Sequence, residues 1–170
     1  MSNGIDTAAD PATQLLELIE SGNWLPPHLF PPPGAQSKNL FGFVPIAAPG
    51  SAYTDIFTPY VVPAGMVLVI NQLGNVVIGA GFIEGTGQVV WQIWDNGNPI
   101  EDYEAIPGSL GGTSDPSKIA PLVFQEGHTV EFVYQNAAGS GIPADSVQVG
   151  ATLRGWLLNR LQTGVVEWPI

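Results

Sequence analysis

The sequence predicts an all-β fold, an antiparallel β-sandwich or jelly roll of about eight strands that follows a short helix and an extended, proline-rich arm. One observation is that residues 125–157 contain two long segments in which apolar and polar side chains alternate, as half-buried strands require. The alternating apolar positions are Val130, Phe132 and Tyr134 in the first segment, and Val147, Val149, Ala151 and Leu153 in the second. A second observation is the content of 21 glycines and 16 prolines, which is typical of many short strands joined by turns.

A short helix is predicted near the start of the chain. Asp10 precedes Pro11, which is the order expected of an N-cap and a first helical residue. An apolar face follows, and Gly22 ends it; its members are Leu15, Leu16, Leu18 and Ile19. A helix of this length is marginal in water by itself. We therefore expect it to lie on a surface, either of its own domain or of a neighbouring subunit.

An arm is predicted over residues 24–34, WLPPHLFPPPG. Prolines fix φ and favour extended neighbours, so this segment should be stiff. Its large apolar side chains are unusual for a disordered linker, because their exposure is unfavourable. They are Trp24, Leu25, Leu29 and Phe30. We divide the chain into the helix and arm, residues 1–38, and a β-sandwich domain, residues 39–170, and expect the apolar set of the arm to bind a partner.

The remaining strands follow in order from Asn39. A short extended piece is expected around Phe41 and Phe43, and a strand over residues 53–62. An apolar strand over residues 66–72 is expected to turn at Gly74–Asn75 into a strand over 76–82. The next strand, residues 88–95, ends in Asp-Asn-Gly-Asn, which predicts a type I′ hairpin. A loop over residues 101–118 leads to the last group, which begins at residue 121.

Charge and composition exclude several classes of function. The net charge is −11, with 4 Lys+Arg against 15 Asp+Glu and no basic cluster. Such a chain is repelled by phosphate backbones, so no nucleic-acid partner is expected. The first ten residues do not resemble a signal peptide, and no apolar run approaches a membrane span, so no membrane association is expected. There is no cysteine, so disulfides and thiolate metal sites are excluded.

The residues do not predict a catalytic, cofactor or metal site. The only histidines are His28 and His128, which lie far apart in the chain, whereas jelly-roll metal enzymes gather several on neighbouring strands. His128 is the one candidate general base in the sandwich. Acidic side chains are available for glycoside hydrolysis, but their spacing selects no pair; they are Glu84, Asp95, Glu101, Asp102, Glu104, Glu126 and Glu131. We expect a protein without enzymatic activity and without a cofactor.

Five tryptophans are numerous for a chain of this size. Trp91 shares a face with Val89 and Ile93, which predicts a place in the core. Trp94 and Trp156 have the opposite parity in their strands and are candidates for surface aromatics. An exposed tryptophan can stack on a sugar ring or pack in a subunit interface, and the sequence leaves both open.

Three segments between residues 53 and 158, approximately, resemble small jelly-roll structural proteins of tailed bacteriophages: VVPAGMVLVINQLG, APLVFQEGHTVEFVYQN and VQVGATLRGWLL. The resemblance implies a virion component without enzymatic activity, assembled in the host cytoplasm. It most closely suggests a capsid decoration or cement protein that clasps neighbouring subunits through its N-terminal arm and contacts the major capsid or other virion proteins. Proteins of this kind commonly form trimers.

Two other classes remain open besides the decoration protein. One is a carbohydrate-binding β-sandwich module, or a tail or neck fibre component with a receptor-binding role, that uses Trp94 or Trp156. The other is a cupin-like enzyme built around His128. A positive mean hydropathy together with 11% charged residues predicts more apolar surface than one sandwich needs to bury. We therefore expect a homo-oligomer, in agreement with the trimer that the resemblance implies.

Overall fold

The computed structural model describes residues 34–159, which belong to the compact unit Pro33–Ile170. The predicted helix and arm, including Leu15, Leu16, Leu18, Ile19, Trp24, Leu25, Leu29 and Phe30, lie outside the described residues. His28 and the C-terminal residues 160–170 lie outside them as well.

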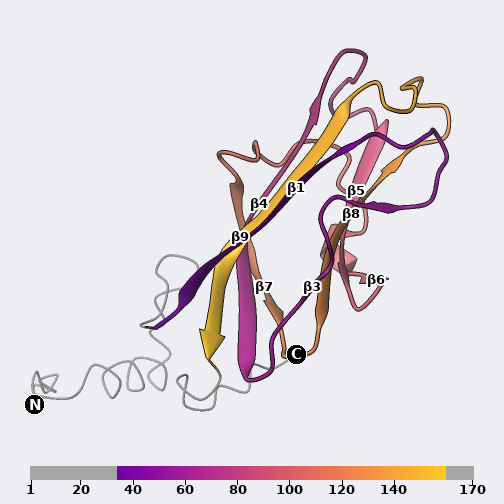
Figure 1. Cartoon of the computed structure of the whole chain (residues 1–170). Helices are drawn as coiled ribbons and strands as arrows, with labels where there is room; N and C mark the ends of the chain where they lie inside the picture. The colour runs from indigo at the N-terminus through magenta and orange to yellow at the C-terminus, as the bar shows by residue number, and fades with distance from the viewer. Residues whose placement is uncertain (1–33, 160–170) are drawn as a thin grey trace, which may run out of the picture. The chain divides into compact units, whose positions relative to one another are not determined.

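The described chain forms two antiparallel sheets packed as a β-sandwich (Figure 1), which confirms the predicted all-β class. Sheet A has the strand order β1-β9-β4-β7. Its strands are β1 (Gln36–Pro45), β9 (Gln148–Asn159), β4 (Met66–Ile78) and β7 (Ser117–Phe124). Sheet B has the order β2-β8-β5-β6, and β3 also pairs with β8. Its strands are β2 (Thr54–Asp55), β3 (Tyr60–Val61), β5 (Val89–Asp95), β6 (Asn98–Pro99) and β8 (Thr129–Asn136), with one 3-10 turn, η1 (Glu101–Tyr103).

The core lies between the sheets and is built from the alternating side chains that the sequence indicated. Val130, Phe132 and Tyr134 of β8 are fully buried, and so is Trp91 of β5. From sheet A, β9 contributes its inner-face residues, which are Val149, Ala151, Leu153 and Leu157. The two long strands β8 and β9 belong to different sheets, so the glycine-bearing loop between them crosses the sandwich.

The predicted turn at Gly74–Asn75 is wrong, because β4 runs without a break from Met66 to Ile78. A bulge between Ile70 and Gln72 shifts its register instead. A Cβ on Gly74 would lie 2.5 Å from the carbonyl oxygen of Gly112, so glycine at this position admits the loop before β7. The buried Asn75 holds the same loop, since its Nδ2 donates to Gly108 O and its Oδ1 accepts from Leu110 N–H.

Three other strand boundaries differ from the predicted ones. The single strand expected over residues 53–62 is two pieces, β2 and β3, separated by a segment that contains Pro59, which cannot donate to a ladder. The short piece expected around Phe41 is the ten-residue strand β1, which begins at Gln36. The strand β7 begins at Ser117, earlier than expected. The Asn96–Gly97 hairpin is confirmed, with φ of 52° and 74° at its two central residues.

Tyr134 ties the two sheets together. Its hydroxyl donates to Pro45 O at 3.0 Å and accepts from Ala47 N–H at 2.8 Å, so a strand of sheet B holds the end of β1. Asn136 acts nearby in the same way, donating through Nδ2 to Ala47 O and Ile142 O. Burial raises the pKa of the Tyr134 hydroxyl above its ordinary value.

A second, small apolar cluster lies on the face of sheet A that points away from the core. It contains Val67 and Val69 of β4 with Trp156 and Leu158 of β9, and all four are buried. Ala35 and Val123 pack against it. Gly155, which directly precedes Trp156 in β9, passes so close to β4 that an added Cβ would lie 1.8 Å from Val69 O.

Candidate functional site

The charged residues of the described chain are divided between the sheets. The four strands of sheet A contain no aspartate or glutamate, although the whole chain carries 15 Asp+Glu. The same strands contain Lys38, Lys118 and Arg154, three of the chain's 4 Lys+Arg. Sheet A is therefore a basic and apolar layer in a strongly acidic protein.

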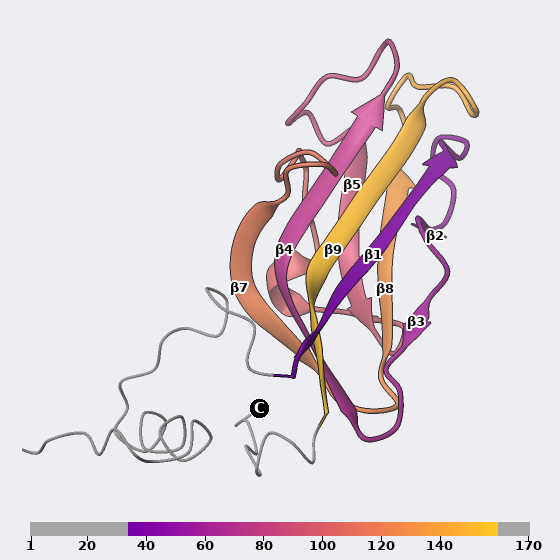
Figure 2. The same cartoon turned by 60° about the vertical axis from the view of Figure 1, so that its left-hand side comes forward.

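The strands of sheet A lie side by side in the order β7, β4, β9 and β1 (Figure 2), and their register places residues of the outer face in cross-strand rows. One row holds the polar residues Lys118, Gln72, Arg154 and Asn39, taken from β7 to β1. The buried cluster around Trp156 lies on one side of this row. On the other side lie four apolar residues that we call the aromatic patch: Phe41 and Phe43 of β1, and Val76 and Ile78 of β4.

Three members of the aromatic patch are exposed, at 51% for Phe41, 38% for Phe43 and 54% for Ile78. The two phenylalanine rings meet edge to face with centroids 5.3 Å apart. Phe43 also lies across its cross-strand partner Gly150, where a Cβ would come within 2.1 Å of the ring. Large exposed apolar groups that gather on one face mark interaction sites in soluble proteins. Because no strand of sheet A carries an aspartate or glutamate, the aromatic patch is a candidate binding surface for a partner that is both apolar and anionic.

The basic residues near the patch differ in how they are held. Lys118 is exposed on β7, an edge strand of sheet A. Arg154 is half-buried, and its Nη2 donates to Thr113 O at 3.0 Å, which fixes the guanidinium over the face. Lys38 has the opposite parity in β1, and its Nζ lies 3.9 Å from the centroid of the Tyr60 ring at the edge of the sandwich.

Trp94, one of the two predicted surface aromatics, lies half-buried on the outer face of sheet B. Its ring centroid is 5.6 Å from that of Tyr53, and the planes are inclined by 56°. The indole Nε1 donates to Gln92 Oε1 at 2.7 Å, and Gln92 in turn donates to Glu104 O. This arrangement fixes the ring and places polar groups beside it.

Trp156, the other predicted surface aromatic, is buried in the second apolar cluster at 8% exposure. The parity prediction for Trp156 was right, because it faces away from the core, but the ring is covered. Its Nε1 makes no hydrogen bond with any of residues 34–159. Trp156 therefore presents no open stacking surface, and Trp91 is fully buried as predicted.

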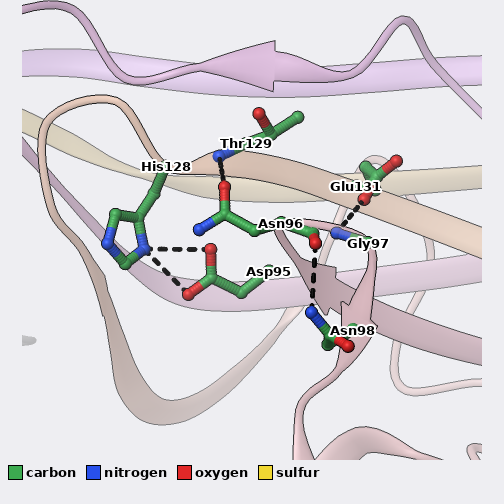
Figure 3. A network of polar contacts seen from close by, with 7 residues as sticks. All are labelled: Asp95, Asn96, Gly97, Asn98, His128, Thr129 and Glu131. Atoms are coloured by element: carbon green, nitrogen blue, oxygen red, sulfur yellow. Dashed lines mark hydrogen bonds and ion pairs between the residues drawn. The ribbon is translucent and has the colours of Figure 1, made fainter.

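His128 forms a pair with Asp95 at one end of sheet B (Figure 3). Its Nδ1 lies 3.0 and 2.9 Å from the two carboxylate oxygens. Around the pair, Asn96 Oδ1 accepts from Thr129 N–H, and Glu131 accepts from Gly97 N–H. An Asp–His pair orients a general base in acyl-transfer enzymes, where a hydroxyl or thiol nucleophile bonds to the second ring nitrogen. Among residues 34–159 no such group is hydrogen-bonded to His128, and the network joins the β5–β6 hairpin to β8.

The acidic residues considered for glycoside hydrolysis are in several cases bound to backbone amides of loops. Glu84 accepts from Ser109 N–H at 3.0 Å, and Glu126 accepts from Gly65 N–H at 2.6 Å. Glu131 and Asp95 belong to the hairpin network. Glu84, Glu126 and Glu131 therefore bind the backbone of turns, and Asp95 binds the His128 ring.

The described ranges contain no group of three or more metal-ligating side chains. They also contain no helix that is long and apolar enough to cross a membrane. The sequence matches no protein-family model, and no curated protein is similar enough to count as a relative. Its function is therefore inferred from the surfaces described above.

The aromatic patch was missed as a site in the sequence, where Phe41 and Phe43 marked only a short extended piece. A signal was present, because Phe-Gly-Phe in a strand places two aromatic rings on one face. The absence of acidic residues from four separate segments was a second signal. Its meaning depends on strand order, which shows that the four segments form one sheet.

Proposed function

We propose that this protein is a non-enzymatic structural component of a bacteriophage virion, a capsid decoration or cement protein that assembles with its own copies and with capsid proteins. The observation that carries the proposal is the exposed aromatic patch on an acid-free sheet. A protein with net charge −11 repels its copies in general. A single basic and apolar face gives such a protein one place where association is favourable.

The strand order supports the finer description of the fold as a jelly roll. If β2 and β3 count as one interrupted strand, the sheets are β1-β9-β4-β7 and β2/β3-β8-β5-β6, which matches two wound Greek keys. Jelly rolls are frequent in viral capsid proteins, lectins and cupins. This likeness rests on architecture alone and does not by itself select a function.

In the proposed function the N-terminal arm clasps a neighbouring subunit, and the assembly forms in the host cytoplasm with the major capsid protein as partner. The test is the location of the protein in a lysate of the host that carries its gene. An antibody against the purified chain should label particles in the density-gradient fraction that contains phage heads. Recovery of the protein only in the soluble fraction would contradict the proposal.

A second candidate function, carbohydrate or receptor binding, is favoured by the Tyr53–Trp94 pair. A fixed, half-exposed indole beside amide and carbonyl groups is a suitable platform for a sugar ring. Titration with oligosaccharides should then change tryptophan fluorescence, and the change should disappear in Trp94→Ala. Unchanged fluorescence across a broad glycan panel would remove this candidate and leave the virion proposal untouched.

A further inference from the structure

The aromatic patch has a definite chemical character. Phe41, Phe43 and Ile78 are exposed at 51, 38 and 54%. Lys118 and Arg154 stand in the polar row beside them, and no carboxylate comes from any strand of the sheet. An occupant that suits this surface must supply large apolar side chains together with acidic groups, and it should carry no cations.

The first 33 residues of the chain have this composition. They contain the acidic residues Asp6, Asp10, Glu17 and Glu20, and no lysine or arginine precedes Lys38. The same segment contains the apolar residues of the predicted helix and arm: Leu15, Leu16, Leu18, Ile19, Trp24, Leu25, Leu29 and Phe30. Both charge and hydrophobicity of this segment complement the outer face of sheet A.

We infer that residues 10–30 of one copy bind the aromatic patch of a second copy; the inference rests on the proposed function, in which arms clasp neighbouring subunits. The contact is heterologous, because each copy offers its patch to one neighbour and its arm to another. Heterologous contacts close into rings when the rotation permits. A ring is compatible with the trimer expected for this protein. Three consecutive prolines, residues 31–33, stiffen the connection and reduce the entropy lost on binding.

The absence of cysteine from the chain allows a direct test with the full-length protein. One variant carries Ser21→Cys in the arm. A second carries Gln148→Cys, an exposed position on the outer face that is paired with Pro45 and Ile78. A control variant carries Ala105→Cys, which is exposed next to Ile106, the residue that bridges to Trp91 of sheet B. Equal amounts of the arm variant and a face variant are mixed, with different tags, and oxidised.

The expected result is a disulfide-linked heterodimer of the Ser21→Cys and Gln148→Cys chains, in at least several-fold excess over the mixture with Ala105→Cys. No excess would overturn the inference. The double variant Ser21→Cys/Gln148→Cys, oxidised at high dilution, should give little internally linked monomer. Internal linkage as the main product would overturn the inference, because the arm would then bind its own chain. Whether the protein is found on particles is measured separately from the cross-link. Failure of the arm–patch contact can therefore be told apart from failure of the proposed virion function.

A charge exchange provides an independent measurement. Lys118→Glu, an exposed substitution, should weaken self-association by about fivefold, the effect of a partly exposed charge pair. Combining it with Glu17→Lys and Glu20→Lys in the arm should restore at least part of the affinity. Equal self-association of the native chain and Lys118→Glu at low salt would count against the contact.

Discussion

Replacement of Tyr134 by phenylalanine tests how the two sheets are joined. The hydroxyl is the only group removed, and it donates to Pro45 O and accepts from Ala47 N–H. Pro45 is exposed, so water can satisfy its carbonyl in the variant. Ala47 is half-buried, so water replaces the lost hydroxyl less easily at its N–H group. An unsatisfied buried donor costs about 1–3 kcal/mol, so we expect a loss of about 2 kcal/mol in the free energy of unfolding.

The assay is denaturant and thermal unfolding followed by circular dichroism. For a domain of this size, the expected loss corresponds to about 4–8 °C in Tm. Tyr53→Phe is the matched control, because its ring packs on Trp94 at the surface of sheet B. The control should change the free energy of unfolding by less than about 0.5 kcal/mol. Equal midpoints for Tyr134→Phe and the native chain would refute the proposed tie between the sheets.

The same variant should also change how stability depends on pH in alkaline solution. Burial raises the pKa of Tyr134 above 10.0 in the folded state, so above about pH 10 the unfolded chain loses its proton first. The folded state then binds more protons than the unfolded state, and stability falls as pH rises through this window. Below pH 10 this contribution is complete. Tyr134→Phe should make the fall of the free energy of unfolding with pH less steep. A smaller fall should remain in this variant, because burial also raises the pKa of Tyr103.

Three further substitutions address the core, the sheet and the hairpin network. Trp91→Ala should cost about 3–5 kcal/mol. Trp91→Phe should cost less than half as much, because it keeps an aromatic ring and removes an indole N–H that has no hydrogen-bond partner within the described part of the chain; equal costs would contradict this. Gly155→Ala should reach or exceed the upper end of the roughly 1–3 kcal/mol cost of overpacking, because its Cβ meets backbone at Val69, and native-like melting would contradict the strand approach. His128→Gln should cost less than about 1 kcal/mol, as expected for a partly exposed pair with Asp95, and a larger loss would show that the network has a greater structural role.

Period-two alternation predicted the core well, because a buried face must be apolar whatever the strand order. Trp91 and the inner residues of β8 and β9 were therefore found correctly. Local turn signals were less reliable. Gly74–Asn75 has the composition of a turn, yet in β4 the glycine admits a neighbouring backbone and the asparagine bonds to a loop distant in sequence. Such tertiary reasons cannot be read from a local pattern.

The same limit applies to the candidate site. Parity indicated that Trp156 faces away from the core, but not that its neighbours across the sheet are Val67 and Val69, which bury it. Phe43 lies across Gly150, a residue more than a hundred positions away, so the place of the ring depends on the pairing of β1 with β9. The acid-free character of sheet A emerges only when four segments are assembled into one layer. The absence of acidic residues from these segments is visible in the sequence, but only the strand order shows that they form one surface.

The most direct test of the assembly surface is the mass of the purified full-length chain, measured by light scattering at micromolar concentration. We expect a multiple of the 17.9 kDa chain, with three copies as the favoured number. The double variant Phe41→Gln/Phe43→Gln should return the protein to a single chain while its circular dichroism stays native-like. A full-length chain that remains at 17.9 kDa across the micromolar range would contradict the account.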